Sequence, residues 1–265
     1  MHAGASRQGL FAMSTANGLA IIGGTGLTRL EGLQIKRREM VHTPWGEPSG
    51  PVTYGVLGGA PVAFLARHGY HHTIPPHQVN YRANIWALKE AKAAAIVSVA
   101  SVGGIRADFA PGTLVVPDQI IDYTWGRKST YFEGGDTPVN HIDFTTPYDE
   151  PLRQRILAAA AAAGEAIFDG GVYASTQGPR LETAAEINRL ERDGADMVGM
   201  TGMPEAALAR ELELCYAAIA VVVNFAAGRG ESSDGVRLED INAVSREAMA
   251  RVRRILDQLV SADGH

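Results

Sequence analysis

The sequence has very little cysteine, because Cys215 is the one cysteine among 265 residues. A single cysteine excludes an intramolecular disulfide framework and points to a reducing compartment. Long hydrophobic runs are also lacking, since stretches such as LCYAAIAVVV at 214–223 are far shorter than the ~20 residues that a membrane-spanning helix needs. We therefore expect a cytoplasmic protein with no membrane partner.

Positive charge is not in excess, since 24 lysines and arginines stand against 29 aspartates and glutamates, for a formal net charge of −5. Such a chain offers no broad basic face, and we expect no nucleic-acid partner. An anion that it binds must instead meet a local cluster of positive or hydrogen-bonding groups.

The first 17 residues are small and polar, lack an apolar core long enough for a signal peptide, and contain a second methionine, Met13. We interpret 1–17 as a flexible extension or an alternative start. Residues 18–265 then form one domain, which is long enough to bury a sizeable core.

Apolar runs of strand length alternate with helical patterns along this domain. The strand-like runs lie at 19–22, 62–66, 95–100, 113–116, 171–175 and 217–223, and the helical patterns at 77–93, 148–164, 182–194, 204–213 and 238–259. This order predicts an α/β fold with a mixed, twisted sheet flanked by helices. The segment 130–147 has no clear periodicity and is predicted to be a long loop, a type that is often functional.

A glycine-rich turn, IIGGTGLT at 21–28, directly follows the first predicted strand. Its backbone N–H groups can converge on an anion, and the Thr25 hydroxyl suits phosphate. A dinucleotide fingerprint would need a glycine at Arg29, and a P-loop would need Gly-Lys-Ser/Thr, so both of those interpretations are weak. A tight turn with no ligand remains the alternative.

The stretch AFLARHGYHH at 63–72 passes from an apolar strand directly into Arg67 and His68. The arginine fork matches phosphate oxygens, and the neighbouring imidazole can donate a further hydrogen bond. The alternatives are a polar surface loop or a metal site built from four histidines, although no nearby carboxylate or cysteine completes a zinc motif. The four are His68, His71, His72 and His77. We expect no bound metal. A third glycine-rich turn is predicted at 100–106, after another strand.

Four motifs together resemble the trimeric purine nucleoside phosphorylases, in the branch that contains methylthioadenosine and methylthioinosine phosphorylases. They are IIGGTGL, LARHGYHHTIPPHQVNYRANIWALKE, TQGPRLETAAEI and DMVGMTGMPEAALARE, and the similarity extends over nearly the whole chain from about Leu19. The resemblance implies a single-domain phosphorylase/hydrolase-like fold and a homotrimer with shared active sites. It also implies inorganic phosphate as co-substrate with a purine nucleoside, and no cofactor.

Matching the motifs residue by residue implies a site. Its phosphate ligands would be Thr25, Arg67, His68, Ala100, Ser101 and Thr201. Its nucleoside-binding residues would be Met200, Glu182, Asn224, Phe225, Ala226, Val236 and His141, the last of which would reach a neighbouring subunit's site. Glu182, Asn224 and His68 would take the catalytic roles.

The chain differs from adenine-using relatives at two of these positions, where Glu182 and Asn224 replace a serine and an aspartate. A 6-oxopurine carries a proton on N1 that the carboxylate can accept, and its N7 or O6 can take a hydrogen bond from the amide. Without the resemblance, Glu182 could be an exposed first-turn helix carboxylate, and Asn224 could simply cap a strand.

The substituent at the 5′ position of the nucleoside is indicated by the absence of a histidine. Phosphorylases for ordinary ribosides carry a histidine after the last strand, but residues 224–241 contain none, while Val236 and Leu238 suit a methylthio group. We therefore predict phosphorolysis of 5′-methylthioinosine. The alternatives are an inosine/guanosine phosphorylase, a methylthioadenosine phosphorylase, a non-catalytic purine-binding module, and a dinucleotide oxidoreductase, against which the missing third glycine argues.

Overall fold

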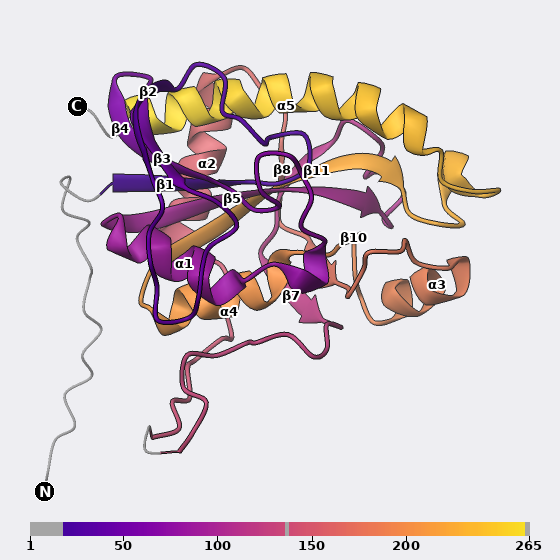
Figure 1. Ribbon diagram of the computed structural model, residues 1–265. Helices are drawn as coiled ribbons and strands as arrows, with labels where there is room; N and C mark the ends of the chain where they lie inside the picture. The colour runs from indigo at the N-terminus through magenta and orange to yellow at the C-terminus, as the bar shows by residue number, and fades with distance from the viewer. Residues whose placement is uncertain (1–17, 136–137, 263–265) are drawn as a thin grey trace, which may run out of the picture.

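The computed structural model describes residues 18–135 and 138–262 (Figure 1). The extension predicted at 1–17 lies outside the described residues. Within them, the chain forms strands β1 (Gly18–Gly23), β2 (Gln34–Glu39), β3 (Val52–Leu57), β4 (Ala60–Ala66), β5 (Ala93–Gly104), β6 (Leu114–Val116), β7 (Gln119–Asp122), β8 (Phe168–Asp169), β9 (Val172–Ser175), β10 (Met197–Gly199) and β11 (Cys215–Phe225). The helices are α1 (Tyr81–Glu90), α2 (Glu150–Ala162), α3 (Ala184–Arg192), α4 (Gly202–Glu211) and α5 (Leu238–Ser261), with short 3₁₀ turns at Pro76–Gln78 and Gly230–Ser232.

The described strands form one mixed sheet that is centred on β5. Its main path runs β2-β3-β4-β1-β5-β10-β9-β7, while β11 pairs with β5 and β6, and β6 pairs with β8. The contacts of β1 with β4 and β5, and of β5 with β11, are parallel. The contacts of β3 with β4 and of β5 with β10 are antiparallel.

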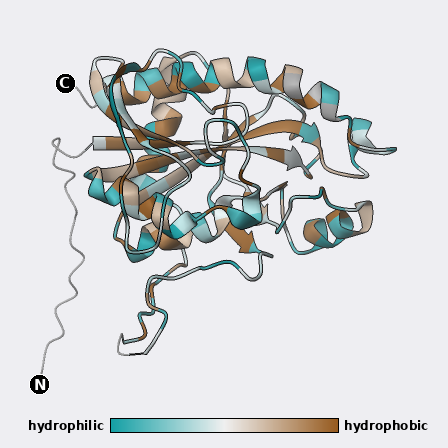
Figure 2. Ribbon diagram, in the orientation of Figure 1, coloured by the Kyte–Doolittle hydropathy of each residue, from teal (hydrophilic) through white to brown (hydrophobic). Residues whose placement is uncertain are grey.

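Helices cover both faces of this sheet, because successive residues of β1 are buried on opposite faces. Leu19 and Ile21 pack into one core with α2 and α5, whereas Ala20 and Ile22 pack into a second core with α1 and α4. Figure 1 shows α5 along one face and α1 and α4 along the other, and Figure 2 shows hydrophobic residues concentrated in the central strands. The predicted α/β class is therefore confirmed.

All the predicted strand-like runs and helical patterns correspond to elements of the structure, with one adjustment. Helix α1 starts at Tyr81 rather than at 77, because the Asn80 side chain accepts from the backbone N–H of Ala83 at 3.1 Å and caps it. The described part of 130–147 contains neither helix nor strand. None of the helices in the described part of the chain is both long enough and apolar enough to cross a membrane.

The prediction of a turn at 100–106 was wrong, because β5 continues through Gly104. Gly103 and Gly104 pair there with Asn224 and Phe225 of β11. A Cβ at Gly104 would lie 2.0 Å from the Phe109 carbonyl oxygen, so glycine serves a close backbone approach rather than a turn. Ala100 and Ser101 are therefore strand residues.

Candidate active site

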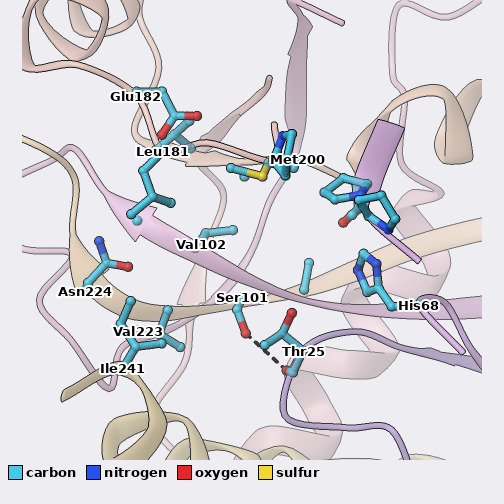
Figure 3. A pocket seen from close by; sticks show the side chains of 18 of the residues that line it. Thr25, His68, Ser101, Val102, Leu181, Glu182, Met200, Val223, Asn224 and Ile241 are labelled. Carbon is cyan, nitrogen blue, oxygen red and sulfur yellow. Dashed lines mark hydrogen bonds between the residues drawn. The ribbon is translucent and has the colours of Figure 1, made fainter. Parts of the chain in front are cut away.

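A cavity of about 530 Å³ opens at the carboxyl ends of the parallel strands. Segments that follow β1, β4, β9 and β10 line it, together with residues near the carboxyl ends of β5 and β11. Ligand sites of open α/β sheets occupy this edge, because loops from neighbouring strands converge there. Figure 3 shows Thr25, Ser101 and His68 toward one end of the cavity, and Glu182 and Asn224 toward the other.

The turn after β1 is one wall of the first end. Leu27 donates its backbone N–H to the Gly24 carbonyl at 3.0 Å, and Gly26 has a φ of 83°, so the chain reverses here as the sequence predicts. The Ser101 hydroxyl donates to the Thr25 carbonyl at 3.2 Å, which fixes the turn against β5 (Figure 3). Two hydroxyls, from Thr25 and Ser101, thereby line the same end of the cavity.

Arg67 lies beneath this end, fully buried, in a bidentate ion pair with the equally buried Glu205 of α4. Its Nε donates to Glu205 at 2.7 Å, and its Nη2 donates to the same carboxylate at 2.8 Å. Nη2 also donates to the Ser98 hydroxyl at 2.6 Å, and Nη1 donates to the Val99 carbonyl at 3.0 Å. Four of the five N–H groups are thus engaged, which leaves one Nη1 hydrogen for a ligand.

The Glu205 carboxylate is satisfied from several sides, because it also accepts from Ser98 and Tyr216, each at 2.8 Å. Burial opposes the charge on Arg67, but the Glu205 carboxylate outweighs burial and raises the pKa of Arg67 above its usual value. Arg67 is therefore charged in the folded protein, with Glu205 as its partner. The two charges of this ion pair nearly cancel under the cavity.

His68 lines the cavity beside Arg67 as a neutral ring. Its Nδ1 donates to the Ile74 carbonyl at 2.8 Å, so Nδ1 carries the proton. Burial and then the neighbouring Arg67 charge lower the pKa of His68 to about 4. The remaining nitrogen, Nε2, therefore has a lone pair at neutral pH, and it accepts hydrogen bonds rather than donating the one expected from the sequence.

His72 is a cavity residue that the sequence argument considered only as a metal ligand. Its ring packs edge-on to His68 at a centroid distance of 4.7 Å, and its Nε2 lies 3.5 Å from the Thr25 hydroxyl. Its φ of 53° is unusual for a residue other than glycine and marks a constrained backbone. Among the described residues, no group of three or more His, Cys, Asp or Glu side chains is placed to hold a metal ion.

The other end of the cavity carries a carboxylate and an amide. Glu182 follows β9 and accepts from the Thr176 hydroxyl at 2.6 Å through Oε1, which leaves Oε2 free of protein partners among the described contacts. Asn224 stands near the end of β11, where its Nδ2 donates to the Phe225 carbonyl at 2.6 Å. Met200, at the start of the segment after β10, lies between the two ends (Figure 3).

Most of the residues implied by the resemblance line this one cavity. They are Thr25, Arg67, His68, Ala100, Ser101, Glu182, Met200, Thr201, Asn224, Ala226 and Val236. Phe225 and His141 are not among its lining residues. The side chain of Leu238 lies outside the described part of the chain, whereas Ile241 of the same helix lines the cavity beside Val236.

Glu205 and the Thr73–Pro76 segment are further functional candidates that the sequence argument missed. A signal for Glu205 was available, since it is a lone acidic residue in the apolar stretch that begins α4. Such a residue is buried only when it is paired.

The family model of the phosphorylase superfamily matches residues 19–261. The chain therefore belongs to the phosphorylase superfamily. It is similar to a probable S-methyl-5′-thioinosine phosphorylase of Pseudomonas syringae pv. tomato, with 57% identity over 243 residues, 92% of this chain and 98% of that protein. A 6-oxopurine nucleoside phosphorylase of Pyrococcus furiosus is 48% identical over 215 residues, 79% of this chain and 80% of that protein.

Solved structures agree with this assignment. Methylthioadenosine phosphorylase from Schistosoma mansoni, in complex with adenine, superposes with a TM-score of 0.89 at 32% identity. The alignment covers 94% of this chain and 92% of that one. The predicted phosphorylase fold is confirmed.

Proposed function

We propose that this protein cleaves a 6-oxopurine nucleoside with phosphate, and that its preferred nucleoside is 5′-methylthioinosine. The products are hypoxanthine and 5-methylthioribose 1-phosphate. One observation carries the proposal: Glu182 and Asn224 share a cavity with the hydroxyl-lined turn at Thr25 and Ser101, at opposite ends (Figure 3). The names of the relatives, which include S-methyl-5′-thioinosine and 6-oxopurine nucleoside phosphorylases, support it.

Base recognition follows from the hydrogen-bonding groups at the second end. The free Oε2 of Glu182 accepts the N1 proton of a 6-oxopurine, and the Asn224 amide donates to N7 or O6. Adenine presents a lone pair at N1 and would face an ionised carboxylate, which is a mispairing that discriminates strongly. The Thr176 hydroxyl, bonded to the other oxygen of Glu182, holds the carboxylate in place.

Phosphate occupies the first end, where Thr25, Ser101 and Thr201 supply hydroxyls and Arg67 supplies its remaining N–H. Ala100 contributes to the same wall. The neutral His68 accepts from a hydroxyl of the sugar or from a protonated phosphate oxygen, which is the role its lone pair allows. The phosphate then lies against the sugar, whose other side contacts Met200.

Chemistry at this site requires no nucleophilic side chain. The N-glycosidic bond breaks with its electron pair moving to the purine, C1′ gains oxocarbenium character, and a phosphate oxygen forms the new bond to C1′. Asn224 stabilises the charge that develops on the departing base. The protein's contribution is the positioning of phosphate and nucleoside, together with hydrogen bonds to the base.

The methylthio preference rests on the apolar side of the cavity. Val236 and Ile241 line it, and the segment 224–241 has no histidine to meet a 5′-hydroxyl. An inosine/guanosine phosphorylase is the second candidate, because the base-recognising pair would be the same. A non-catalytic purine-binding module would not need the phosphate end.

We further propose a cytoplasmic homotrimer that uses inorganic phosphate as co-substrate and no cofactor. In such an assembly His141, which is exposed and is not among the residues that line this chain's own cavity, would reach the site of a neighbouring subunit. Phe225 would contribute through its backbone, since its carbonyl holds the Asn224 amide.

The decisive experiment is a phosphate-dependent assay across methylthioinosine, inosine, guanosine and methylthioadenosine at equal concentrations. We expect release of hypoxanthine from methylthioinosine with the highest kcat/KM, and none without phosphate. Equal efficiency on inosine would transfer the assignment to an inosine/guanosine phosphorylase. Purine binding without phosphate-dependent turnover would contradict catalysis altogether.

A further inference from the structure

Arg127 follows β7 at the beginning of the long connection to α2, and its guanidinium holds together segments that are distant in the sequence. Its Nη1 donates to the carbonyl of Met200 at 2.8 Å and to that of Met203 at 2.6 Å. Its Nη2 donates to the carbonyl of Gln177 at 2.8 Å and to that of Thr176 at 3.2 Å. Nε donates to the Gln177 side chain at 3.2 Å.

These acceptors belong to two different walls of the cavity. Thr176 and Gln177 begin the segment that carries Glu182, and the Thr176 hydroxyl bonds the Glu182 carboxylate. Met200 begins the other segment and lines the cavity together with Thr201. Arg127 itself is not a lining residue, so it acts on the site only through the backbone of these walls.

A third wall is connected more loosely. Nη1 of Arg127 lies 3.3 Å from the Tyr81 hydroxyl, which donates to the Pro76 carbonyl at 2.9 Å. Pro76 lines the cavity next to the histidines. The guanidinium therefore lies at the junction of three segments that contribute residues to the cavity lining.

The acceptors that the described residues offer to Arg127 are carbonyl, amide and phenol oxygens, and none is a carboxylate. The cation is half-buried, so this arrangement differs from an ordinary surface ion pair. Only a planar fork reaches carbonyls on both sides at once, because a lysine ammonium is a single point on a flexible stem.

We propose that Arg127 is a positioning residue of the phosphorolysis site, which keeps the wall that carries Glu182 and the wall that carries Met200 at a fixed separation. The inference rests on the proposed function. The distance between these two walls decides whether a nucleoside whose base binds at the Glu182 end has its C1′ correctly placed over phosphate at the Thr25 end. A displacement of about 1 Å at such a site can cost on the order of 100-fold in rate.

The test uses Arg127→Ala and Arg127→Lys in the full chain, with Arg153→Ala as the matched control. Arg153 is buried and, like Arg127, donates to backbone carbonyls, those of Pro117 and Val116, although it also pairs with Glu150 and Asp169. It lies in α2 and is not among the residues that line the cavity. Each protein is measured for thermal unfolding, for kcat, and for KM of methylthioinosine and of phosphate. The assays are repeated with guanidinium chloride at non-denaturing, millimolar concentration.

For Arg127→Ala we expect kcat/KM for the nucleoside to fall by roughly 100-fold. The KM for nucleoside should rise, and added guanidinium should restore several-fold activity. Arg127→Lys should recover little, and Arg153→Ala should lose thermal stability while keeping both KM values and gaining nothing from guanidinium.

Unchanged KM values in Arg127→Ala, or a guanidinium response no larger than that of the control, would overturn the positioning role. If Arg127→Ala does not fold, Arg127→Lys decides. Failure of both variants to fold would assign Arg127 to stability alone and also overturn the proposal. Wild-type turnover is measured first, so that an inactive wild type refutes the proposed function separately.

Discussion

At the scale of single residues, the burial of Arg67 changes how its role can be tested. Its guanidinium makes a bidentate pair with Glu205 and is fully buried. Removing one partner of a buried pair leaves an uncompensated charge and costs about 3 to 5 kcal/mol. Arg67→Ala should therefore lower the free energy of unfolding as well as weaken phosphate binding. A raised KM for phosphate in this variant has to be compared with its unfolding data.

The base-recognising pair gives a specificity prediction. Replacing Glu182 with Ser and Asn224 with Asp together should raise kcat/KM on methylthioadenosine and lower it on methylthioinosine. The aspartate can accept from the 6-amino group and, if protonated, donate to N7, while Glu182 no longer opposes N1. Competition assays with both nucleosides measure the ratio.

The single change Asn224→Asp is the control and should do less. Glu182 would still oppose the N1 lone pair of adenine, so the mispairing at that position would remain. A wild-type protein that already cleaves both nucleosides equally well would remove the basis of this argument.

His68 gives a prediction of how the stability of the protein depends on pH. Its pKa is lowered to about 4 by burial and the Arg67 charge, whereas in an unfolded chain a histidine titrates near 6.5. Below pH ~6.5 the unfolded chain takes up a proton that the folded ring refuses, so the free energy of unfolding falls as pH drops toward 4. The full effect is on the order of 3 kcal/mol.

Urea unfolding at pH 7.5 and at pH 4.5 checks this, with His68→Gln as the comparison. The glutamine variant lacks the titrating ring, so its stability relative to wild type should improve at the lower pH. A constant difference between the two proteins at both pH values would show that His68 is not held neutral.

At the scale of elements, strands were predicted best from the sequence where they are apolar on both faces. The runs at β1, β5 and β11 are buried on both sides and were readily recognised. Strand β2, QIKRRE, was missed because it is exposed along its whole length, and its pairing with β3 comes from tertiary contact. Strand β10 has three residues, too few for a periodic pattern.

The site was predictable in part for the same reason. Its residues follow strand ends that the hydrophobic pattern marks, and the family resemblance supplied their roles. The orientation of each group was not predictable. That Arg67 faces Glu205, and that His68 donates through Nδ1 to Ile74, depend on packing between elements far apart in sequence.

The start of α3 carries an element-scale prediction, because Glu182 immediately precedes its cap. The Thr183 hydroxyl accepts from the Glu186 backbone N–H at 3.1 Å, and the Glu186 carboxylate accepts from the Thr183 backbone N–H at 2.7 Å. Thr183→Ala should cost about 1 kcal/mol. For a chain of this size that lowers the unfolding temperature by roughly 2 to 4 °C.

The same change should raise the KM for nucleoside more than the KM for phosphate, because the loosened turn displaces Glu182 and leaves the other end of the cavity intact. Thr183→Ser keeps the hydroxyl and should behave like wild type. An equal rise in both KM values would argue that the helix start does not act through Glu182.

At the scale of the whole molecule, the long connection from β7 to α2 is where assembly is expected. Trp125 and Val139 in this segment are 72% and 70% exposed in the single chain. Burial of these two apolar side chains against a neighbouring chain would be favourable. Sedimentation at assay concentration should give a particle of three chains of 28.2 kDa each.

In that particle, His141→Ala should lower kcat/KM without changing the sedimentation coefficient. Trp125→Ser, by contrast, should shift the protein toward monomers. A fully active wild-type monomer would contradict both the assembly and the shared site.

The ion pair beneath the cavity also bears on how phosphate arrives. Among the described residues that line the cavity, Arg67 is the one arginine or lysine, and Glu205 balances its charge. A chain of net charge −5 with such a floor has no attractive long-range field to steer a dianion, so encounter proceeds without electrostatic assistance. Capture then depends on short-range hydrogen bonds that salt screens little, and occupancy follows the surrounding phosphate concentration rather than ionic strength.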